Sequence, residues 1–219
     1  MKPFKPPSPY ATNTLIGLCI AVQAALMLGG RAFGDAVIAS FGLVPLRITH
    51  ALSGVSQLSG LLPGAVTHIF LHAGWVHLAL NMVFLAWVGR YVEWVAGRVG
   101  VIAIFLAGGL IGGAAQVLAS PTGLVPVIGA SGGISAVFGA YAMMFATSRI
   151  NTRRMLGLQV SGEVLTALWY AASWIGLQLL VGYAFSAGQG PSIAIWTHVG
   201  GFLAGLVFAR RYGRGPKVF

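Results

Sequence analysis

Apolar runs about as long as a membrane-crossing helix recur along the whole chain. They lie at about residues 13–30, 76–94, 101–119, 131–148, 164–186 and 193–209. A helix needs roughly 20 apolar residues to cross a bilayer. Hydrophobic residues make up 57% of the chain and charged residues only 7%, which excludes an ordinary soluble domain. The sequence therefore predicts an all-α polytopic membrane protein, a bundle of six transmembrane helices.

The basic residues are distributed unevenly over the predicted loops. Six spans place both termini on one side of the membrane, and all 13 Lys and Arg residues except Arg31 and Arg47 fall on that side. Cytoplasmic loops are enriched in Lys and Arg, so we expect both termini in the cytoplasm. The formal net charge of +10 then reflects topology and contact with anionic lipids, and we expect no nucleic-acid partner.

The predicted organisation is one membrane domain between two short tails. We expect a cytoplasmic tail at residues 1–11, the six-helix domain at 12–212 and a second cytoplasmic tail at 213–219. The first apolar run is longer than the apolar part of a typical signal peptide, so we interpret it as the first transmembrane helix. The single cysteine, Cys19, excludes an intramolecular disulfide.

The stretch between the first two spans, from about Arg31 to Trp75, is too apolar to lie free in water. We expect it to fold on or partly into the outer leaflet, through an amphipathic segment at about residues 35–46. Its end carries His68 and His72, spaced four residues apart. No cysteine or acidic partner lies nearby, so we expect no metal and interpret these histidines as hydrogen-bonding groups of the loop.

Ser131 lies in a run of small residues, Gly129 to Gly133, where an apolar loop enters the fourth span. The neighbouring glycines leave its hydroxyl unshielded. The first turn of the following helix also offers unpaired backbone N–H groups and a positive dipole end, which suit a developing oxyanion. The same small residues can equally serve close helix packing and nothing else.

Three polar side chains fall inside other predicted spans. His77 and Asn81 are four residues apart and so share one helix face, while His198 opens the sixth span. Polar groups at this depth either join helices by hydrogen bonds or form a functional site. Gly201 and Gly205 give the sixth span a small-residue face, which would bring His198 to the serine of the fourth span.

Together these residues provide the parts of a serine hydrolase. Ser131 would be the nucleophile and His198 the base that takes its proton, with His77 and Asn81 as donors to an oxyanion. The predicted topology places Glu93 and Glu163 at the cytoplasmic side and Asp35 in the first loop. A serine–histidine dyad without a carboxylate is therefore the simplest interpretation.

The chain resembles the rhomboid family of intramembrane serine proteases, over roughly residues 12–212. The matching motifs are His77-x-x-x-Asn81, Gly129-Ala130-Ser131-Gly132, and His198-x-Gly200-Gly201 with Gly205. The motifs occur in the order and on the spans typical of the family.

This resemblance implies a six-helix core with Ser131 as nucleophile and His198 as general base. His77, Asn81 and the backbone N–H of Ser131 would form the oxyanion hole. The implied substrates are transmembrane segments of other proteins, cut near the outer face of the membrane, in this case the inner membrane of a bacterium. No cofactor is expected, and the oligomeric state stays open.

Two positions depart from common family features. Many rhomboids carry Trp-Arg in the first loop where this chain has Pro63-Gly64, and some stack an aromatic residue on the catalytic histidine where this chain has Ser135. The fifth span carries no ionisable side chain, and we hypothesise that this span and the loop after it move to admit substrate laterally.

Two other functions remain as alternatives. A rhomboid-like pseudoprotease would bind transmembrane partners without cutting them, although such proteins are expected to lack the serine or the histidine. A small transporter could line a polar path with the same side chains. We expect no buried acid for ion coupling, and the sequence shows no obvious inverted repeat; both count against transport.

Overall fold

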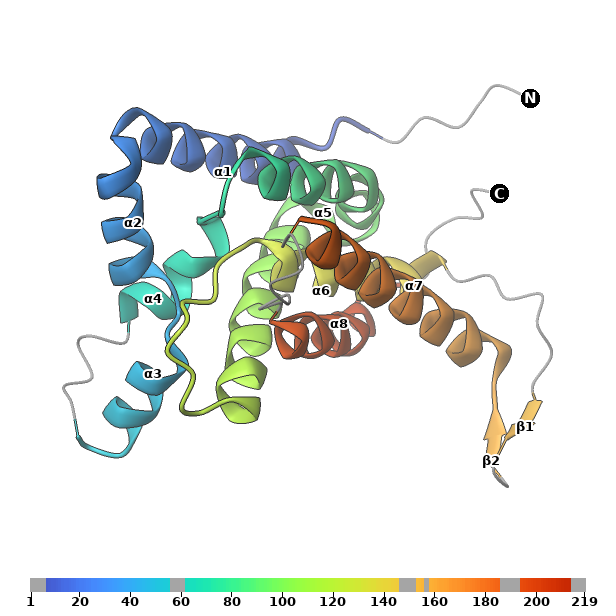
Figure 1. The fold of residues 1–219 in the computed structure, drawn as a ribbon. Helices are drawn as coiled ribbons and strands as arrows, with labels where there is room; N and C mark the ends of the chain where they lie inside the picture. The colour runs from blue at the N-terminus through green and yellow to red at the C-terminus, as the bar shows by residue number, and fades with distance from the viewer. Residues whose placement is uncertain (1–6, 56–61, 146–152, 156–157, 186–193, 214–219) are drawn as a thin grey trace.

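The computed structural model describes residues 7–55, 62–145, 153–155, 158–185 and 194–213. The two predicted tails fall mostly outside these residues. Helices dominate the described chain (Figure 1), in the order α1 (Tyr10–Leu28), α2 (Gly30–Phe41), α3 (Pro45–Leu52), α4 (Leu62–Thr67), the short 3₁₀ helix η2 (His68–Phe70), α5 (Trp75–Ala119), α6 (Ser131–Phe145), α7 (Gly162–Phe185) and α8 (Ile195–Ala209). The predicted helical fold class is confirmed.

The predicted second and third spans form one continuous element, α5, with a break at a single residue. Gly97 has φ 75° and ψ 174°, a conformation that residues with a Cβ rarely adopt. The chain can therefore turn between two helices without a loop of any length.

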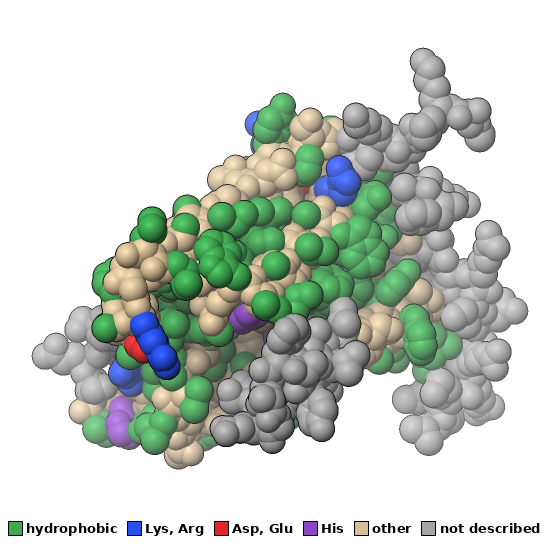
Figure 2. All heavy atoms as spheres, turned by 45° about the horizontal axis from the view of Figure 1, so that its top comes forward, with side chains coloured by type: hydrophobic (Ala, Val, Ile, Leu, Met, Phe, Trp, Pro, Cys, Tyr) green, Lys and Arg blue, Asp and Glu red, His purple; other side chains and the backbone are tan. Residues whose placement is uncertain are grey.

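The helices have the character of membrane segments. Of the described residues, those of α1 and α5 form helices long and apolar enough to cross a bilayer, while α6, the Val164–Gly176 part of α7, and α8 are shorter apolar helices. In Figure 2 apolar side chains are spread over the whole described part of the face, whereas basic side chains appear at only a few places on it. The protein is an integral membrane protein.

Two short strands are an addition to the predicted fold. β1 (Arg153–Met155) pairs with β2 (Leu158–Val160) in antiparallel register, with Arg153 opposite Val160. Each strand has only three residues, too few for the period-two pattern that reveals a strand in sequence. The pair lies just before α7 (Figure 1).

The first loop is folded, but the amphipathic segment predicted at residues 35–46 is not one helix. Helix α2 ends at Phe41, Gly42 is extended, and a new helix begins at Pro45. Between them Leu43 forms an isolated β-bridge with Val127, with N···O distances of 3.1 and 2.8 Å. The first loop is thereby joined to the segment that leads into Ser131.

Helices α5, α6 and α8 pack backbone to backbone in the centre of the molecule (Figure 1). A Cβ at Gly201 would collide with the carbonyl oxygen of Gly132, and one at Gly205 with that of Ala136. The predicted close packing of the sixth span on the fourth is thus observed. A Cβ at Gly108 on α5 would collide with the Cβ of Ala136, so small residues fix the register of all three helices.

Glu93 caps the first helix from a distant part of the chain. Its carboxylate accepts hydrogen bonds from the backbone N–H groups of Ala11 and Thr12 at 2.9 and 2.8 Å, and from the Thr12 hydroxyl at 2.7 Å. These N–H groups lie in the first turn of α1, where they have no partner within the helix and where the dipole favours an anion. Glu93 therefore fastens α1 to α5.

We expect Glu93→Ala to lower the free energy of unfolding by about 2–3 kcal/mol, because it leaves buried donors of α1 without an acceptor. The measurement is thermal or denaturant unfolding in detergent micelles. Asp35→Ala is the matched control, since the Asp35 side chain is 73% exposed and pairs only loosely with Arg31. Equal stability of the two variants would contradict this role of Glu93.

Candidate active site

Ser131 is the first residue of α6, and the backbone before it makes a sharp turn. Gly129 has φ +127°, a conformation that favours glycine. Its N–H donates to the carbonyl oxygen of His68 at 2.9 Å. The turn places the Ser131 side chain at the helix start, where first-turn N–H groups have no partner inside the helix.

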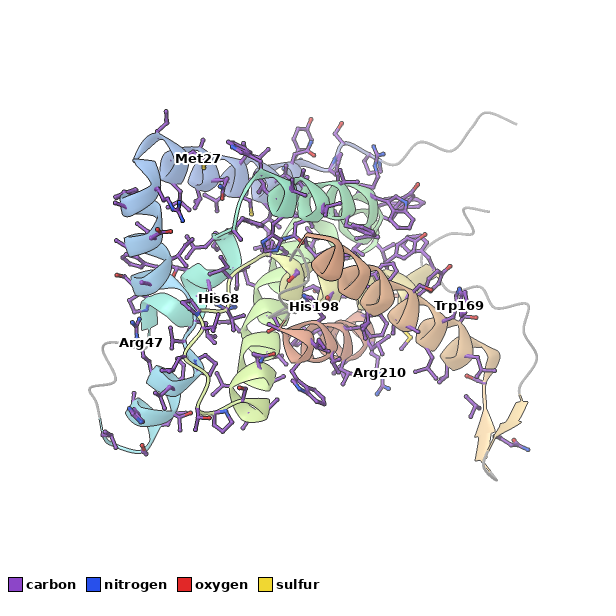
Figure 3. All side chains as sticks on the ribbon, viewed as in Figure 1. Met27, Arg47, His68, Trp169, His198 and Arg210 are labelled. Atoms are coloured by element: carbon purple, nitrogen blue, oxygen red, sulfur yellow. The ribbon has the colours of Figure 1, made fainter. Side chains whose placement is uncertain are left out.

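His198 approaches Ser131 from α8. Its Nε2 lies 2.8 Å from the Ser131 Oγ, a hydrogen-bond distance. Both residues are buried, with 6% of His198 and 7% of Ser131 exposed. The contact follows from the glycine packing of α8 on α6, since Gly201 lies one turn beyond His198 and touches the carbonyl of Gly132. Figure 3 shows His198 at the centre of the molecule.

His77 lies on the other side of the serine. Its Nδ1 accepts the Ala73 N–H at 3.4 Å, which leaves the ring proton on Nε2. A Cβ at Gly129 would lie 2.9 Å from His77 Cε1, 3.0 Å from its Nε2 and 3.7 Å from the Ser131 Oγ. The donor edge of His77, the turn at Gly129 and the serine hydroxyl therefore surround one small space.

Asn81 lies one helical turn after His77 on α5. It is almost fully buried, and its Nδ2 has no hydrogen-bond partner among the described residues. A buried donor without a partner is unusual in a folded protein. It leaves Asn81 free to donate to a bound group.

The described acidic side chains have partners away from His198. Asp35 lies 3.9 Å from Arg31 within α2. Glu93 caps α1 and is separated from His77 by 16 helix positions, about 24 Å along α5. The side chain of Glu163 lies outside the described residues. No described carboxylate therefore approaches His198.

The first-loop histidines form hydrogen bonds with backbone carbonyl groups. His68 Nδ1 donates to the carbonyl oxygen of Gly64 at 2.9 Å and His72 Nδ1 to that of Phe70 at 3.2 Å. At the Pro63-Gly64 departure, a Cβ at Gly64 would come within 2.7 Å of the Gly42 carbonyl oxygen. Glycine thus allows α4 to pack closely here, and His68 links this packing to the turn at Gly129.

The first-loop histidines predict acid sensitivity. Burial lowers the pKa of His68 from 6.5 to about 4, and that of His72 also to about 4. Both are neutral in the folded protein. Their contribution to the free energy of unfolding is therefore fully present above pH 6.5, and it is lost as the pH falls towards 4, because the unfolded chain takes up protons first. For His68 the loss amounts to about 3 kcal/mol. Unfolding measured between pH 7 and 4 should show this slope, reduced in His68→Gln; a flat profile would refute it.

A second buried contact involves α7 and was missed from the sequence. The indole Nε1–H of Trp174 donates to the Ser135 Oγ at 2.7 Å, one turn below Ser131 on α6. Trp174 is 3% exposed, and its ring packs edge-on against Phe84 at 4.4 Å. A buried tryptophan needs an acceptor and a buried serine needs a donor, but the sequence does not show that these two meet.

These observations define a helical integral membrane protein with a serine–histidine pair buried where two helices begin. A sequence model described as the Rhomboid domain matches residues 59–215. The chain belongs to the rhomboid family.

Several curated proteins are similar to this chain. Rhomboid protease GluP of Bacillus subtilis (strain 168) is 28% identical over 210 residues, which is 96% of this chain and 36% of that protein. Rhomboid-related protein 3 of Homo sapiens is 35% identical over 108 residues, 47% of this chain and 26% of that protein. Inactive rhomboid protein 2 of Homo sapiens is 30% identical over 141 residues, 64% of this chain and 14% of that protein. The chain thus spans less than half the length of these relatives.

Proposed function

We propose that the protein is an intramembrane serine endopeptidase that uses Ser131 and His198 as a catalytic dyad. The observation that carries this proposal is the 2.8 Å contact between the His198 Nε2 and the Ser131 Oγ. It lies at the start of helix α6, and Asn81, one helical turn after His77 on α5, has a buried Nδ2 without a partner among the described residues. Relatives named as proteases, among them GluP, support the same function.

In this mechanism His198 takes the hydroxyl proton at Nε2 while the Ser131 Oγ attacks the carbonyl carbon of the substrate peptide bond. The carbonyl oxygen becomes an oxyanion that accepts hydrogen bonds from the Ser131 N–H, the His77 Nε2–H and the Asn81 Nδ2. The C–N bond then breaks, and His198 gives its proton to the leaving amine. A water molecule, deprotonated by His198, hydrolyses the acyl ester on Ser131.

The proposed substrates are transmembrane segments of other proteins, cut near the outer face of the membrane. The proposed topology has six spans, with the tails at residues 1–11 and 213–219 in the cytoplasm and residues 12–212 as the membrane domain. A helix in lipid has all its backbone groups paired, so it must unwind before its peptide bond can reach Ser131. Substrates with helix-weakening residues near the cut are therefore favoured.

The proposal is tested by treating the purified protein in detergent with a fluorophosphonate probe and locating the modified residue by mass spectrometry. Labelling at Ser131, together with cleavage of a transmembrane substrate in proteoliposomes, is the expected result. A folded protein that neither reacts at Ser131 nor cleaves would refute it. The similarity to Inactive rhomboid protein 2 favours a binding-only function as the second candidate, and this outcome would support it.

We further propose that α7 moves to admit the substrate laterally, and that Trp174 keeps α7 packed against the other helices in the closed position. Trp174 is the only large side chain of the described part of α7 that is buried. Its contacts with Ser135 on α6 and Phe84 on α5 join α7 to both of these helices. Movement of α7 would open the site without displacing Ser131 or His198.

We expect Trp174→Phe and Ser135→Ala each to raise the cleavage rate of a transmembrane substrate about 2–10-fold, because each removes a bond worth about 0.5–1.5 kcal/mol. Since both remove the same bond, the double variant should add little. Labelling by the small probe should change less than cleavage. Ser173→Ala, at an exposed neighbouring position, is the control. Unchanged cleavage in both variants would argue against this role of Trp174.

A further inference from the structure

An elongated cavity of about 380 Å³ lies between α7 and α8, with α6 at its base. We name it the α7–α8 groove. On α7 it is lined by Val164, Leu168, Ala171 and Ile175. These positions follow the three- and four-residue spacing of one helix face. On α8 a similar face lines it, from Val199 through Leu203 to Leu206, and Arg210, directly after the helix, completes it.

The groove is apolar along its length and charged at one end. Among the described residues that line it, Arg210 alone is ionisable. Val199 and Arg210 are 11 positions apart on α8, so the groove extends about 16 Å along this helix. Figure 3 shows Arg210 towards the end of α8 remote from His198.

This length matches one half of a bilayer. The hydrocarbon core is about 30 Å thick, so one leaflet contributes about 15 Å. A transmembrane helix of a substrate spans the whole core and would extend beyond the groove. An acyl chain of a single leaflet fits it, with its headgroup at the level of Arg210.

The walls of the groove are incompletely covered by the protein itself. Val164 is 49% exposed and Leu168 57% exposed on α7, and Leu203 is 55% exposed on α8. Large apolar side chains on two facing helices usually pack against one another. Here the space between them is left for another apolar group.

We propose that the α7–α8 groove binds one anionic phospholipid, with an acyl chain along the groove and its phosphate on Arg210. Guanidinium groups bind phosphate oxygens through paired N–H donors. Basic residues between membrane helices are suited to anionic headgroups. The phosphate end of the site is remote from the serine–histidine pair, because Arg210 follows His198 by 12 positions, about 18 Å along the helix. The lipid fills the space between α7 and α8 and so limits the movement of α7.

The test measures lipid retention on the delipidated, detergent-purified protein by native mass spectrometry. Phosphatidylglycerol and phosphatidylcholine with identical acyl chains are titrated separately, so that only the headgroup charge differs. We expect phosphatidylglycerol to bind about tenfold or more tightly than phosphatidylcholine. Arg210→Gln should remove this preference, because it removes a charge-assisted hydrogen bond. Arg211→Gln is the matched control, since Arg211 is exposed and does not line the groove.

A second variant tests the groove itself. Ala171→Trp would place a large side chain in the middle of the groove and should weaken binding of both lipids. Circular dichroism and thermal unfolding in detergent verify that each variant is folded. The proposal is overturned if Arg210→Gln keeps the preference for phosphatidylglycerol, or if a folded Ala171→Trp protein binds both lipids like the wild type. Because binding is read directly, this result does not depend on whether the protein cleaves substrates.

Discussion

His198→Ala is expected to lower the cleavage rate by about 10⁴-fold or more, because loss of the base in serine hydrolases has effects of this size. In this protein the His198 Nε2 is the group that contacts the Ser131 Oγ, at 2.8 Å, and no described carboxylate lies near enough to take its place. The measurement is cleavage of a transmembrane substrate in proteoliposomes, together with fluorophosphonate labelling of Ser131.

His50→Ala is the matched control for this experiment, since His50 is an exposed histidine on α3. It should cleave at the wild-type rate. Ser131→Ala should lose labelling altogether. If His198→Ala retained a rate within tenfold of the wild type while folded, another group would have to act as the base, and the proposed dyad would be wrong.

Asn81→Ala is expected to lower kcat by about 10²–10³-fold, the usual effect of removing one oxyanion donor. KM should change little, because the donor acts on charge that develops only in the transition state. The unpaired Nδ2 of Asn81 also predicts that this variant is at least as stable as the wild type. Removal of a buried donor that has no partner relieves a desolvation cost.

This combination distinguishes an oxyanion donor from a residue that only joins helices. A structural Asn81 would give a destabilised protein with a smaller effect on kcat. Asn13→Ala, at an exposed position of α1, serves as the control for an asparagine-to-alanine change. Unfolding and steady-state kinetics are measured on the same preparations.

The approach of His198 to Ser131 could be predicted because it depends on a pattern within single helices. Gly201 and Gly205 mark one face of the sixth span, and small residues in membrane helices mark faces that pack closely. The first-loop contacts could not be predicted in this way. The bridge between Leu43 and Val127 joins residues far apart in sequence, and neither residue type indicates its partner.

The contact between Trp174 and Ser135 could not be predicted for the same reason. Each side chain needs a hydrogen-bond partner in an apolar setting, but the partner is set by the relative height of two helices. The division of the first loop at Gly42 was also missed, because the apolar pattern continues from α2 into α3. Periodicity thus predicts elements, whereas their mutual register comes from packing. The roles of Ser131, His198, His77 and Asn81 stay predictions until the variants are measured.

Because glycines pack α8 directly on α6, the backbone sets the separation of the two helices and with it the distance between the His198 Nε2 and the Ser131 Oγ. Gly201 and Gly205 rest on the carbonyl oxygens of Gly132 and Ala136, so the backbones of the two helices meet directly at these positions. Backbones in direct contact have little freedom to shift. A thicker or thinner bilayer can therefore tilt α7 while the α6–α8 pair keeps its alignment. Membrane composition would then alter how often a substrate enters, and leave the rate of the chemical step unchanged.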